Sequence, residues 1–239
     1  ISIQLSISAL NYLNNCIKFA QSLLQQECVL CGAGVRAQSL CAACHEHLPY
    51  LCEPCCKVCA LPIPDGELCG ACLSDPPAFD STRAAFSYSF PVDALIQALK
   101  YQGNLALAPI LAAELLPKAG AHLDYLIPVP LSTARLRERG FNQALEIARI
   151  ISNKLGVTLL ANACSRILDN PPQAGLPWKE RSKNIRGAFR CNAELRGKKV
   201  ALLDDVMTTG ATLNELAKVV RKQGAIEINA WVVARTLPP

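Results

Sequence analysis

The sequence predicts an α/β fold, with a parallel sheet flanked by helices and a cysteine-rich module at its N-terminus. Two observations predict it. Beyond about residue 80, apolar runs typical of buried parallel strands alternate with segments of helical spacing. Before that point the cysteines recur as C-x2-C pairs, and ten of the thirteen in the chain fall between Cys28 and Cys72. We therefore expect one domain held by a hydrophobic core and a smaller one held by metal ligands.

Length and composition indicate a soluble globular protein. The 239 residues suit one ordinary domain and a smaller one, and a hydrophobic content of 51% with mixed charge excludes a disordered chain. No apolar run approaches the ~20 residues needed to span a bilayer. The N-terminus has neither a basic region nor a small-residue cleavage site, so no secretory signal is expected. These features predict a cytoplasmic protein without membrane insertion.

Residues 7–25 carry apolar side chains at helical spacing and predict an amphipathic helix that packs on its neighbours. A role at a membrane surface has little support, because Lys18 is the only cation of the segment. The predicted domains are this N-terminal helix (1–27), the cysteine-rich module (28–77) and the α/β domain (78–239).

The cysteines predict two structural zinc sites. Each C-x2-C places two thiolates on one tight turn, and two such turns complete a tetrahedral site. Because protein supplies all four ligands, the zinc is expected to be structural rather than catalytic. The pairing nearest in sequence assigns Cys28, Cys31, Cys41 and Cys44 to one site and Cys56, Cys59, Cys69 and Cys72 to the other.

The sequence leaves other ligand arrangements open. A crossed pairing, or a single occupied site, would use the same cysteines. Cys52 and Cys55 form a further C-x2-C pair, and His45 or His47 could replace a thiolate. Three more cysteines are isolated in the sequence and are expected to be ordinary core or surface residues: Cys16, Cys164 and Cys191.

Beyond Ser74-Asp75-Pro76-Pro77, periodicity predicts alternating strands and helices, hence a parallel sheet with a ligand at the carboxyl ends of its strands. The predicted strands are 83–90, 125–129, 157–160, 186–191, 200–203 and 226–235. The predicted helices are one that starts at 92 and ends within 100–103, one over 105–116, one that opens within 135–143 and runs to about 155, and one over 213–223. Residues 169–184 lack clear periodicity, and a loop of that length inside a compact domain indicates a function.

The segment V-A-L-L-D-D-V-M-T-T-G-A-T, residues 200–212, predicts a strand, a tight loop and the start of a helix. In that arrangement the loop amides and the helix N-terminus point at one spot, which suits a phosphate. The carboxylates of Asp204 and Asp205 follow at the end of the strand, within reach of hydroxyls attached to that phosphate. A phosphate beside a vicinal diol points to a ribose 5-phosphate.

Basic charge belongs to the same part of the chain. Residues 1–80 carry a net charge of −4 and residues 81–239 a net charge of +9. Arg135, Arg137 and Arg139 alternate between a strand end and a helix, a placement that suits a polyphosphate. The charge is compatible with polyphosphate ligands, with nucleic acid, or with a solvated basic surface.

Residues 200–212 resemble the signature of type I phosphoribosyltransferases, which bind phosphoribosyl pyrophosphate (PRPP). From Cys28 to Thr236 the chain resembles the ComF family of competence-associated, phosphoribosyltransferase-like proteins, which includes ComFC and GntX-type members. Besides the cysteine pairs and residues 200–212, the motifs that carry the resemblance are L-K-Y-Q-G (99–103), P-V-P-L (128–131), R-L-R-E-R-G-F-N-Q (135–143) and P-P-Q-A-G-L (171–176). The resemblance implies a type I phosphoribosyltransferase-like sheet.

The resemblance also implies site residues. Asp204 and Asp205 would hold the ribose hydroxyls and serve as the catalytic pair. Magnesium would bridge pyrophosphate and ribose, bound mainly through the ligand, and residues 170–184 would close over PRPP. The 5-phosphate would be held by Thr208, Thr209, Gly210, Ala211 and Thr212. The remaining PRPP contacts would come from Lys100, Tyr101, Pro130, Leu131 and Arg135.

Two functions follow from the resemblance. One is a competence protein that handles internalised single-stranded DNA in the cytoplasm, beside partners such as a DNA helicase, with a PRPP site kept for binding. The other is an active phosphoribosyltransferase that displaces pyrophosphate at C1 in favour of an unidentified base or amine. Purine-salvage relatives have an aspartate where this chain has Thr208, which argues against a 6-oxopurine acceptor. Because aromatic residues are only 5% of the chain, any DNA affinity is expected to depend on phosphate contacts.

Overall fold

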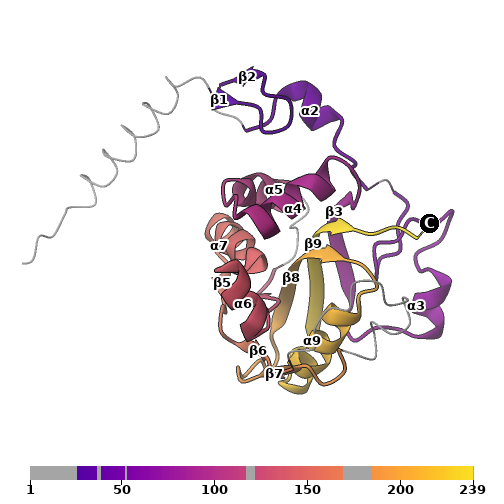
Figure 1. Ribbon diagram of the computed structural model, residues 1–239. Helices are drawn as coiled ribbons and strands as arrows, with labels where there is room; N and C mark the ends of the chain where they lie inside the picture. The colour runs from indigo at the N-terminus through magenta and orange to yellow at the C-terminus, as the bar shows by residue number, and fades with distance from the viewer. Residues whose placement is uncertain (1–25, 37–38, 52, 117–121, 169–184, 239) are drawn as a thin grey trace, which may run out of the picture. The chain divides into compact units, whose positions relative to one another are not determined.

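A computed structural model describes residues 26–36, 39–51, 53–116, 122–168 and 185–238 of the chain (Figure 1). The helix predicted over 7–25 and the loop predicted over 169–184 lie outside these residues, as do Cys16 and Cys52. The described residues form two compact units, one up to Leu48 and one from Pro49 onward, and each is described by itself. This division falls inside the cysteine-rich segment, and the domains 1–27, 28–77 and 78–239 remain a prediction.

The first unit has little hydrophobic core. Its β1 (Gln26–Glu27) and β2 (Gly34–Val35) pair as a short antiparallel hairpin, followed by α2 (Ala42–Glu46). Within the described residues, its buried aliphatic side chains are Val35, Leu40 and Leu48. An apolar core of this size requires a further crosslink to stabilise a fold.

The second unit is built on a five-stranded parallel sheet, which confirms the predicted fold class. Its strand order is β3-β9-β8-β4-β5. The two central strands are apolar over most of their length because both of their faces are covered. The strands are β3 (Ser81–Ser87), β4 (Tyr125–Pro128), β5 (Thr158–Leu159), β8 (Lys199–Met207) and β9 (Glu227–Arg235).

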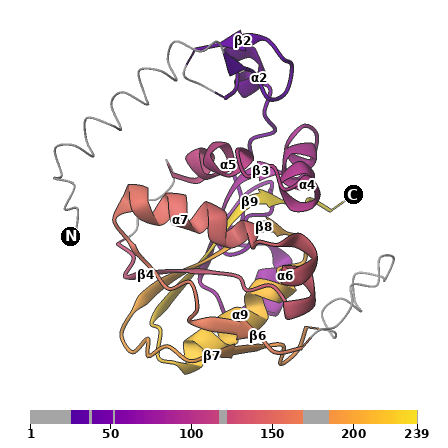
Figure 2. The same ribbon diagram turned by 60° about the vertical axis from the view of Figure 1, so that its left-hand side comes forward.

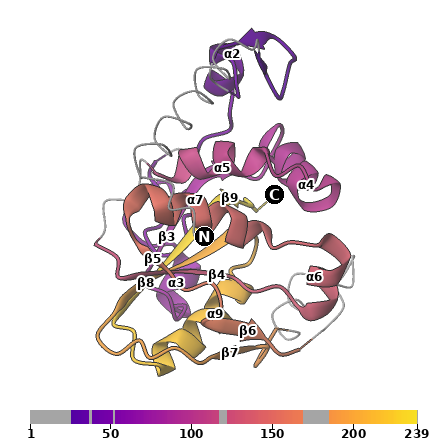
Figure 3. The ribbon, with the colours of Figure 1, turned by 90° about the vertical axis from the view of Figure 1, so that its left-hand side faces the viewer.

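Helices cover both faces of this sheet. Figures 2 and 3 show α4 (Val92–Gln102), α5 (Leu107–Leu115) and α7 (Gln143–Leu155) on one face, with α9 (Ala211–Lys222) on the other. Each helix buries the apolar stripe that its sequence spacing predicts, as α9 does with Leu213, Leu216, Ala217 and Val220. None of the described helices combines the length and hydropathy needed to cross a bilayer.

Two predictions about secondary structure were confirmed only in part. Instead of one helix over the arginine-rich segment there are two, α6 (Thr133–Arg139) and α7, because Gly140 ends α6 at a φ of 78° and Asn142 caps α7. The strand predicted over 186–191 is β7 (Phe189–Cys191), and it lies outside the main sheet. It pairs antiparallel with β6 (Cys164–Arg166), a strand that the sequence pattern did not predict.

The part of the cysteine-rich segment that belongs to the second unit, from Pro49 to Ser74, covers the β3 edge of the sheet. The Leu51 amide donates to Ala85, the Thr82 amide donates to Lys57, and Tyr50 forms an isolated bridge with Phe86. These bonds occupy backbone groups of β3 that would otherwise be free to pair with another chain. The short α3 (Gly70–Ser74) completes this segment.

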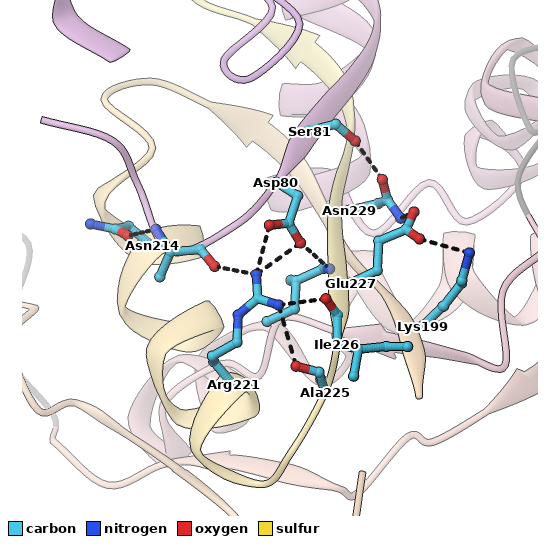
Figure 4. Close-up of polar contacts among 11 residues, drawn as sticks. Asp80, Ser81, Lys199, Asn214, Arg221, Ala225, Ile226, Glu227 and Asn229 are labelled. Atoms are coloured by element: carbon cyan, nitrogen blue, oxygen red, sulfur yellow. Dashed lines mark hydrogen bonds and ion pairs between the residues drawn. The ribbon is translucent and has the colours of Figure 1, made fainter. Parts of the chain in front are cut away.

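A polar network fixes the C-terminal end of α9 against β3 and β9 (Figure 4). The Arg221 guanidinium donates to both carboxylate oxygens of Asp80 at 2.8 Å and to the carbonyls of Ala225 and Ile226. The Ile228 amide donates to Asp80 at 2.7 Å. This network positions the helix, and therefore also the direction in which its N-terminus points.

Candidate functional site

The end of β8, a short loop and the start of α9 form the segment predicted to hold a phosphate. Gly210 is the N-cap of α9 at a φ of 80°, a left-handed conformation that favours glycine, and a Cβ there would also have to displace Cε of Met207, 2.7 Å away. As a glycine it has no side chain to cap the helix, and among the described residues the side-chain bond at this end is that from the Ala211 amide to the Thr209 hydroxyl. The amides that follow Ala211 are available to an anion, and the helix dipole favours one.

The hydroxyl residues of this loop lie where the sequence predicts them. Thr208 and Thr209 are half-buried between strand and helix, and the Thr209 hydroxyl accepts a hydrogen bond from the Ala211 amide at 3.1 Å. Thr212 lies in the first turn of α9 and is also half-buried. The structure thus brings residues 208–212 together at one end of the sheet.

The two adjacent carboxylates have different environments. Asp205 is only 4% exposed, and its Oδ1 lies 2.9 Å from Nζ of Lys100, near the end of α4. Its Oδ2 is buried and has no hydrogen-bond partner among the described residues. Asp204 is half-buried, and its Oδ1 accepts a hydrogen bond from the Asp205 amide at 2.9 Å. Because successive residues of a strand face opposite sides, the pair does not form a single surface.

Asp204 is the more unusual of the two. Burial, together with the negative charge of Asp205, raises the pKa of the Asp204 carboxyl to about 7, against the opposing effect of Lys100 and Arg166. A carboxyl with a pKa near neutrality is a candidate functional group. In its ionised form it accepts hydrogen bonds from hydroxyls or binds a divalent cation.

The turn after β4 lies beside these carboxylates. The Val129 amide donates to the carbonyl of Leu203 at 2.8 Å, one residue before Asp204. Asn142 donates from its side chain to the carbonyl of Val129 and thereby fixes the turn. Pro130 and Leu131 follow directly and are half-buried.

The arginine-rich segment lies on α6, next to the end of α4. Arg135 and Arg139 are one helical turn apart and share a face, whereas Arg137 is exposed. The guanidinium carbon of Arg139 lies 5.1 Å from the ring centre of Tyr101, a cation–π distance. The Tyr101 side chain is 69% exposed, so its ring is accessible beside the site.

The β6–β7 hairpin contributes residues that sequence reasoning missed. Arg166 lies near enough for its charge to lower the pKa of Asp204, and its guanidinium carbon is 5.9 Å from the ring centre of Phe189. No motif surrounds Arg166 in the sequence. Cys164 and Cys191, although isolated in the sequence, are both buried and lie directly opposite each other in the hairpin. Their mutual hydrogen bond lowers the pKa of Cys191 to about 6 and raises that of Cys164.

Both predicted cysteine clusters have the geometry of a tetrahedral zinc site. In each cluster the four sulfurs lie within 4.8 Å of one another. The sulfurs of Cys31 and Cys41 are 3.7 Å apart, and those of Cys59 and Cys69 are 3.6 Å apart. Zinc–sulfur bonds of about 2.3 Å at tetrahedral angles place sulfurs about 3.8 Å apart. The donor sets therefore fit structural zinc.

The pairing nearest in sequence is confirmed. One cluster consists of Cys28, Cys31, Cys41 and Cys44, and the other of Cys56, Cys59, Cys69 and Cys72. Cys55, His45 and His47 do not belong to either cluster as found among the described residues. The first cluster lies in the first unit, and the second lies beside the phosphoribosyltransferase-like sheet of the second unit.

Comparisons with known proteins place both clusters in one domain match. Residues 19–73 match the double zinc ribbon domain, and residues 102–237 match the phosphoribosyl transferase domain. Competence protein F of Haemophilus influenzae is 32% identical over 222 residues, which cover 87% of this chain and 96% of that protein. The DNA utilization protein YhgH of Salmonella typhimurium is 31% identical over 76% of this chain and 84% of its own. Competence protein ComFC of Streptococcus pneumoniae is 26% identical over 65% and 68%.

Because the identity to competence protein F extends over almost its whole length, the match is not confined to one widespread domain. The chain belongs to the competence protein F family, and it combines a double zinc ribbon domain with a phosphoribosyl transferase domain.

Proposed function

We propose that the second unit binds PRPP with magnesium at the carboxyl edge of its sheet, and that the protein uses this site in handling internalised single-stranded DNA in the cytoplasm. One observation carries the proposal. Asp204, with its raised pKa, lies near the end of β8, and the loop that follows this strand leads into the N-terminus of α9. A hydroxyl acceptor and a phosphate site on one strand–loop–helix match the two ends of a ribose 5-phosphate.

Each part of the segment has its own task in this proposal. The amides of residues 208–212 and the hydroxyls of Thr208, Thr209 and Thr212 hold the 5-phosphate. Asp204 accepts hydrogen bonds from the ribose hydroxyls in its ionised form. Asp205 stays in its ion pair with Lys100 and contributes the negative charge that helps to raise the pKa of Asp204.

The pyrophosphate would lie between the turn at Pro130 and Leu131 and the cations of α6. Arg135 and Arg139 lie one turn apart on α6, so both guanidinium groups would donate hydrogen bonds to the pyrophosphate. Magnesium suits the oxygens of the pyrophosphate together with a carboxylate such as Asp204. When bound, it would neutralise part of the charge of the ligand.

A second candidate function is an active phosphoribosyltransferase. The accessible Tyr101 ring, backed by Arg139, offers a surface on which a planar base could stack beside the site. In such a reaction a nitrogen lone pair would form the bond to C1 of the ribose while the bond to pyrophosphate breaks. The protein would position both groups and stabilise the charge on the pyrophosphate.

The DNA part of the proposal has separate support. Residues 81–239 carry a net charge of +9, which favours a polyanion. Relatives that match over most of this chain carry the names competence protein F and DNA utilization protein. Association with further competence proteins, such as a DNA helicase, is part of the proposal and would be tested by copurification at low salt.

A ligand series tests the PRPP site. Calorimetry in magnesium should show PRPP binding more tightly than either ribose 5-phosphate or pyrophosphate, because each of these fills only part of the site. Equal affinity for pyrophosphate and PRPP would contradict a ribose site. Release of pyrophosphate from PRPP in the presence of bases or amines then separates the two functions. Turnover would establish the enzyme, and binding without turnover would favour the binding role.

A further inference from the structure

A buried arginine connects the second cysteine cluster to the candidate phosphate loop. Arg235, the last residue of β9, is only 2% exposed. Its Nε donates to the carbonyl of Cys59 at 2.9 Å. Its Nη1 donates to the carbonyls of Met207, at 3.0 Å, and of Thr208. A single guanidinium therefore bonds both to a cysteine of the second cluster and to the residues that open the loop.

The charge of Arg235 has a source of compensation in the same cluster. Among the described residues, no carboxylate forms an ion pair with it. Four thiolates around one Zn²⁺ carry a net charge of about −2. A buried cation is strongly destabilising without a counter-charge, and a filled second zinc site supplies one.

Packing makes a second connection between the same two places. The Thr82 hydroxyl donates to the carbonyl of Val58, between two cluster cysteines, at 2.6 Å, and lies 3.9 Å from the sulfur of Met207. Met207 and Phe79 in turn are the nearest side chains to the Cβ position of Gly210, at 2.7 and 3.8 Å. Both belong to the same buried core as Cys56, Cys59 and Cys72.

We infer that Arg235 is a positioning residue that couples the second zinc site to the loop at Met207–Thr212, so that PRPP binding depends on metal in this site and not on metal in the first. This inference rests on the proposed function, because it assumes that PRPP is the ligand of the loop. Arg235 itself touches neither PRPP nor metal. It fixes two carbonyls of the loop and so leaves the neighbouring amides oriented for the 5-phosphate. The zinc holds the Cys59 turn against which the guanidinium is anchored.

Coupling of this kind is reciprocal, because a ligand that depends on the metal site must also affect it. The wild-type chain reconstituted with ¹¹³Cd should give two cadmium NMR signals. The double variant Cys28→Ser/Cys31→Ser removes the signal of the first site and assigns the other. Saturation with magnesium and PRPP should shift the signal of the second site and leave that of the first unchanged. If PRPP binds by calorimetry and neither signal moves, or both move alike, the inference is wrong and the proposed function stands.

Variants of Arg235 give an independent test. Arg235→Lys keeps the charge but loses the planar fork that reaches several carbonyls. We expect PRPP affinity to fall on the order of tenfold, the effect of losing hydrogen bonds from a charged donor. Wild-type affinity in this variant would contradict the inference. Arg149→Lys is the control, since Arg149 is an exposed arginine of α7 that pairs with Glu146, and the PRPP affinity of this variant should remain that of the wild type.

Amide hydrogen exchange separates this inference from the PRPP proposal. Without any ligand, residues 207–212 should exchange faster in Arg235→Lys than in the wild type, while the core of β8 before Asp204 exchanges at the same rate. This result would support the coupling even if PRPP did not bind, in which case the proposed function alone would fail. Unchanged exchange in the loop would contradict the coupling.

Discussion

Nζ of Lys100, near the end of α4, lies 2.9 Å from Oδ1 of Asp205 at the end of β8, and their side chains are only 18% and 6% exposed. This ion pair joins two motifs that are about a hundred residues apart in the chain. It also gives the two adjacent aspartates different roles. Asp205 has a fixed partner on α4, and Asp204 is left with a raised pKa and the capacity to bind a ligand.

Removal of the Lys100 charge should strongly destabilise the second unit. Lys100→Met leaves Asp205 as a buried charge without its partner, and losing one member of such a pair costs about 3–5 kcal/mol. Urea denaturation followed by circular dichroism measures the change. Lys218→Met is the control, because Lys218 pairs with Glu215 at the surface and should contribute less than about 1 kcal/mol. Similar effects in both variants would show that the Lys100 pair is not buried in solution.

Neutralising Asp204 should stabilise the protein, in a pH-dependent way. The pKa of its carboxyl is about 7 in the folded state and 3.8 in the unfolded chain. Between these two pH values the folded protein therefore holds a proton on Asp204 that the unfolded chain has lost. The contribution of Asp204 to stability is therefore greatest below about pH 4 and is lost as the pH rises through 7.

Asparagine is uncharged at every pH, like the protonated carboxyl, so the variant Asp204→Asn keeps its stability where the wild type loses stability by ionising Asp204. Its advantage in melting temperature over the wild type should grow from pH 4 to pH 7 and then level off. Thermal melts at four pH values measure it, with Asp65→Asn, a change at an exposed carboxylate, as the control. An advantage that does not depend on pH would contradict the raised pKa.

Gly210→Ala should impair the loop more than a comparable substitution elsewhere. Both Gly210 and Gly187 have positive φ, which costs roughly 1–2 kcal/mol for alanine. Only at Gly210 does the new methyl also meet the buried Met207, whereas the space at Gly187 is open. Chemical denaturation should therefore show a larger loss for Gly210→Ala, and calorimetry a loss of PRPP affinity in that variant alone. Equal losses of stability would mean that Met207 moves aside freely.

Metal analysis should find two zinc ions per chain, because two separate tetracysteine clusters are formed. Elemental mass spectrometry of protein purified without added metal measures the ratio. Cys28→Ser/Cys31→Ser should reduce it to one and leave the fold of the second unit intact. One zinc in the wild type would show that one cluster is not a metal site.

Binding to single-stranded DNA should weaken steeply with salt. With few aromatic residues and a net charge of +9 over residues 81–239, contacts to phosphates should dominate, and the slope of log affinity against log salt should be about −0.7 per phosphate contacted. Fluorescence anisotropy of a labelled oligonucleotide between 50 and 200 mM salt measures it. No binding at low salt would remove DNA from the proposed function.

Local patterns predicted the parts of the fold that depend on local sequence. The apolar run before Asp204 and the spacing after Thr212 predicted β8, the loop and α9, and the C-x2-C spacing predicted both cysteine clusters. The break between α6 and α7 was missed because a helical pattern continues across Gly140.

Contacts distant in sequence could not be predicted from these patterns. Arg235 ends an apolar strand, where a charged residue usually faces solvent, yet its environment is made by two segments remote from it in the chain. The β6–β7 pairing likewise places Arg166 near Asp204 without any motif around it. The sequence could therefore place the candidate site residues on their strand, loop and helices, whereas it could not predict their partners.

The central claim, that Asp204 and the loop after it hold the ribose of PRPP, is tested most directly by calorimetric titration of magnesium and PRPP into the wild type and Asp204→Asn at pH 8. The claim predicts clear binding in the wild type and in the control Asp65→Asn, and a loss of at least about tenfold in Asp204→Asn, since a charged acceptor is lost. The variant should lose this affinity while its melting temperature rises. Wild-type affinity in Asp204→Asn would contradict the claim.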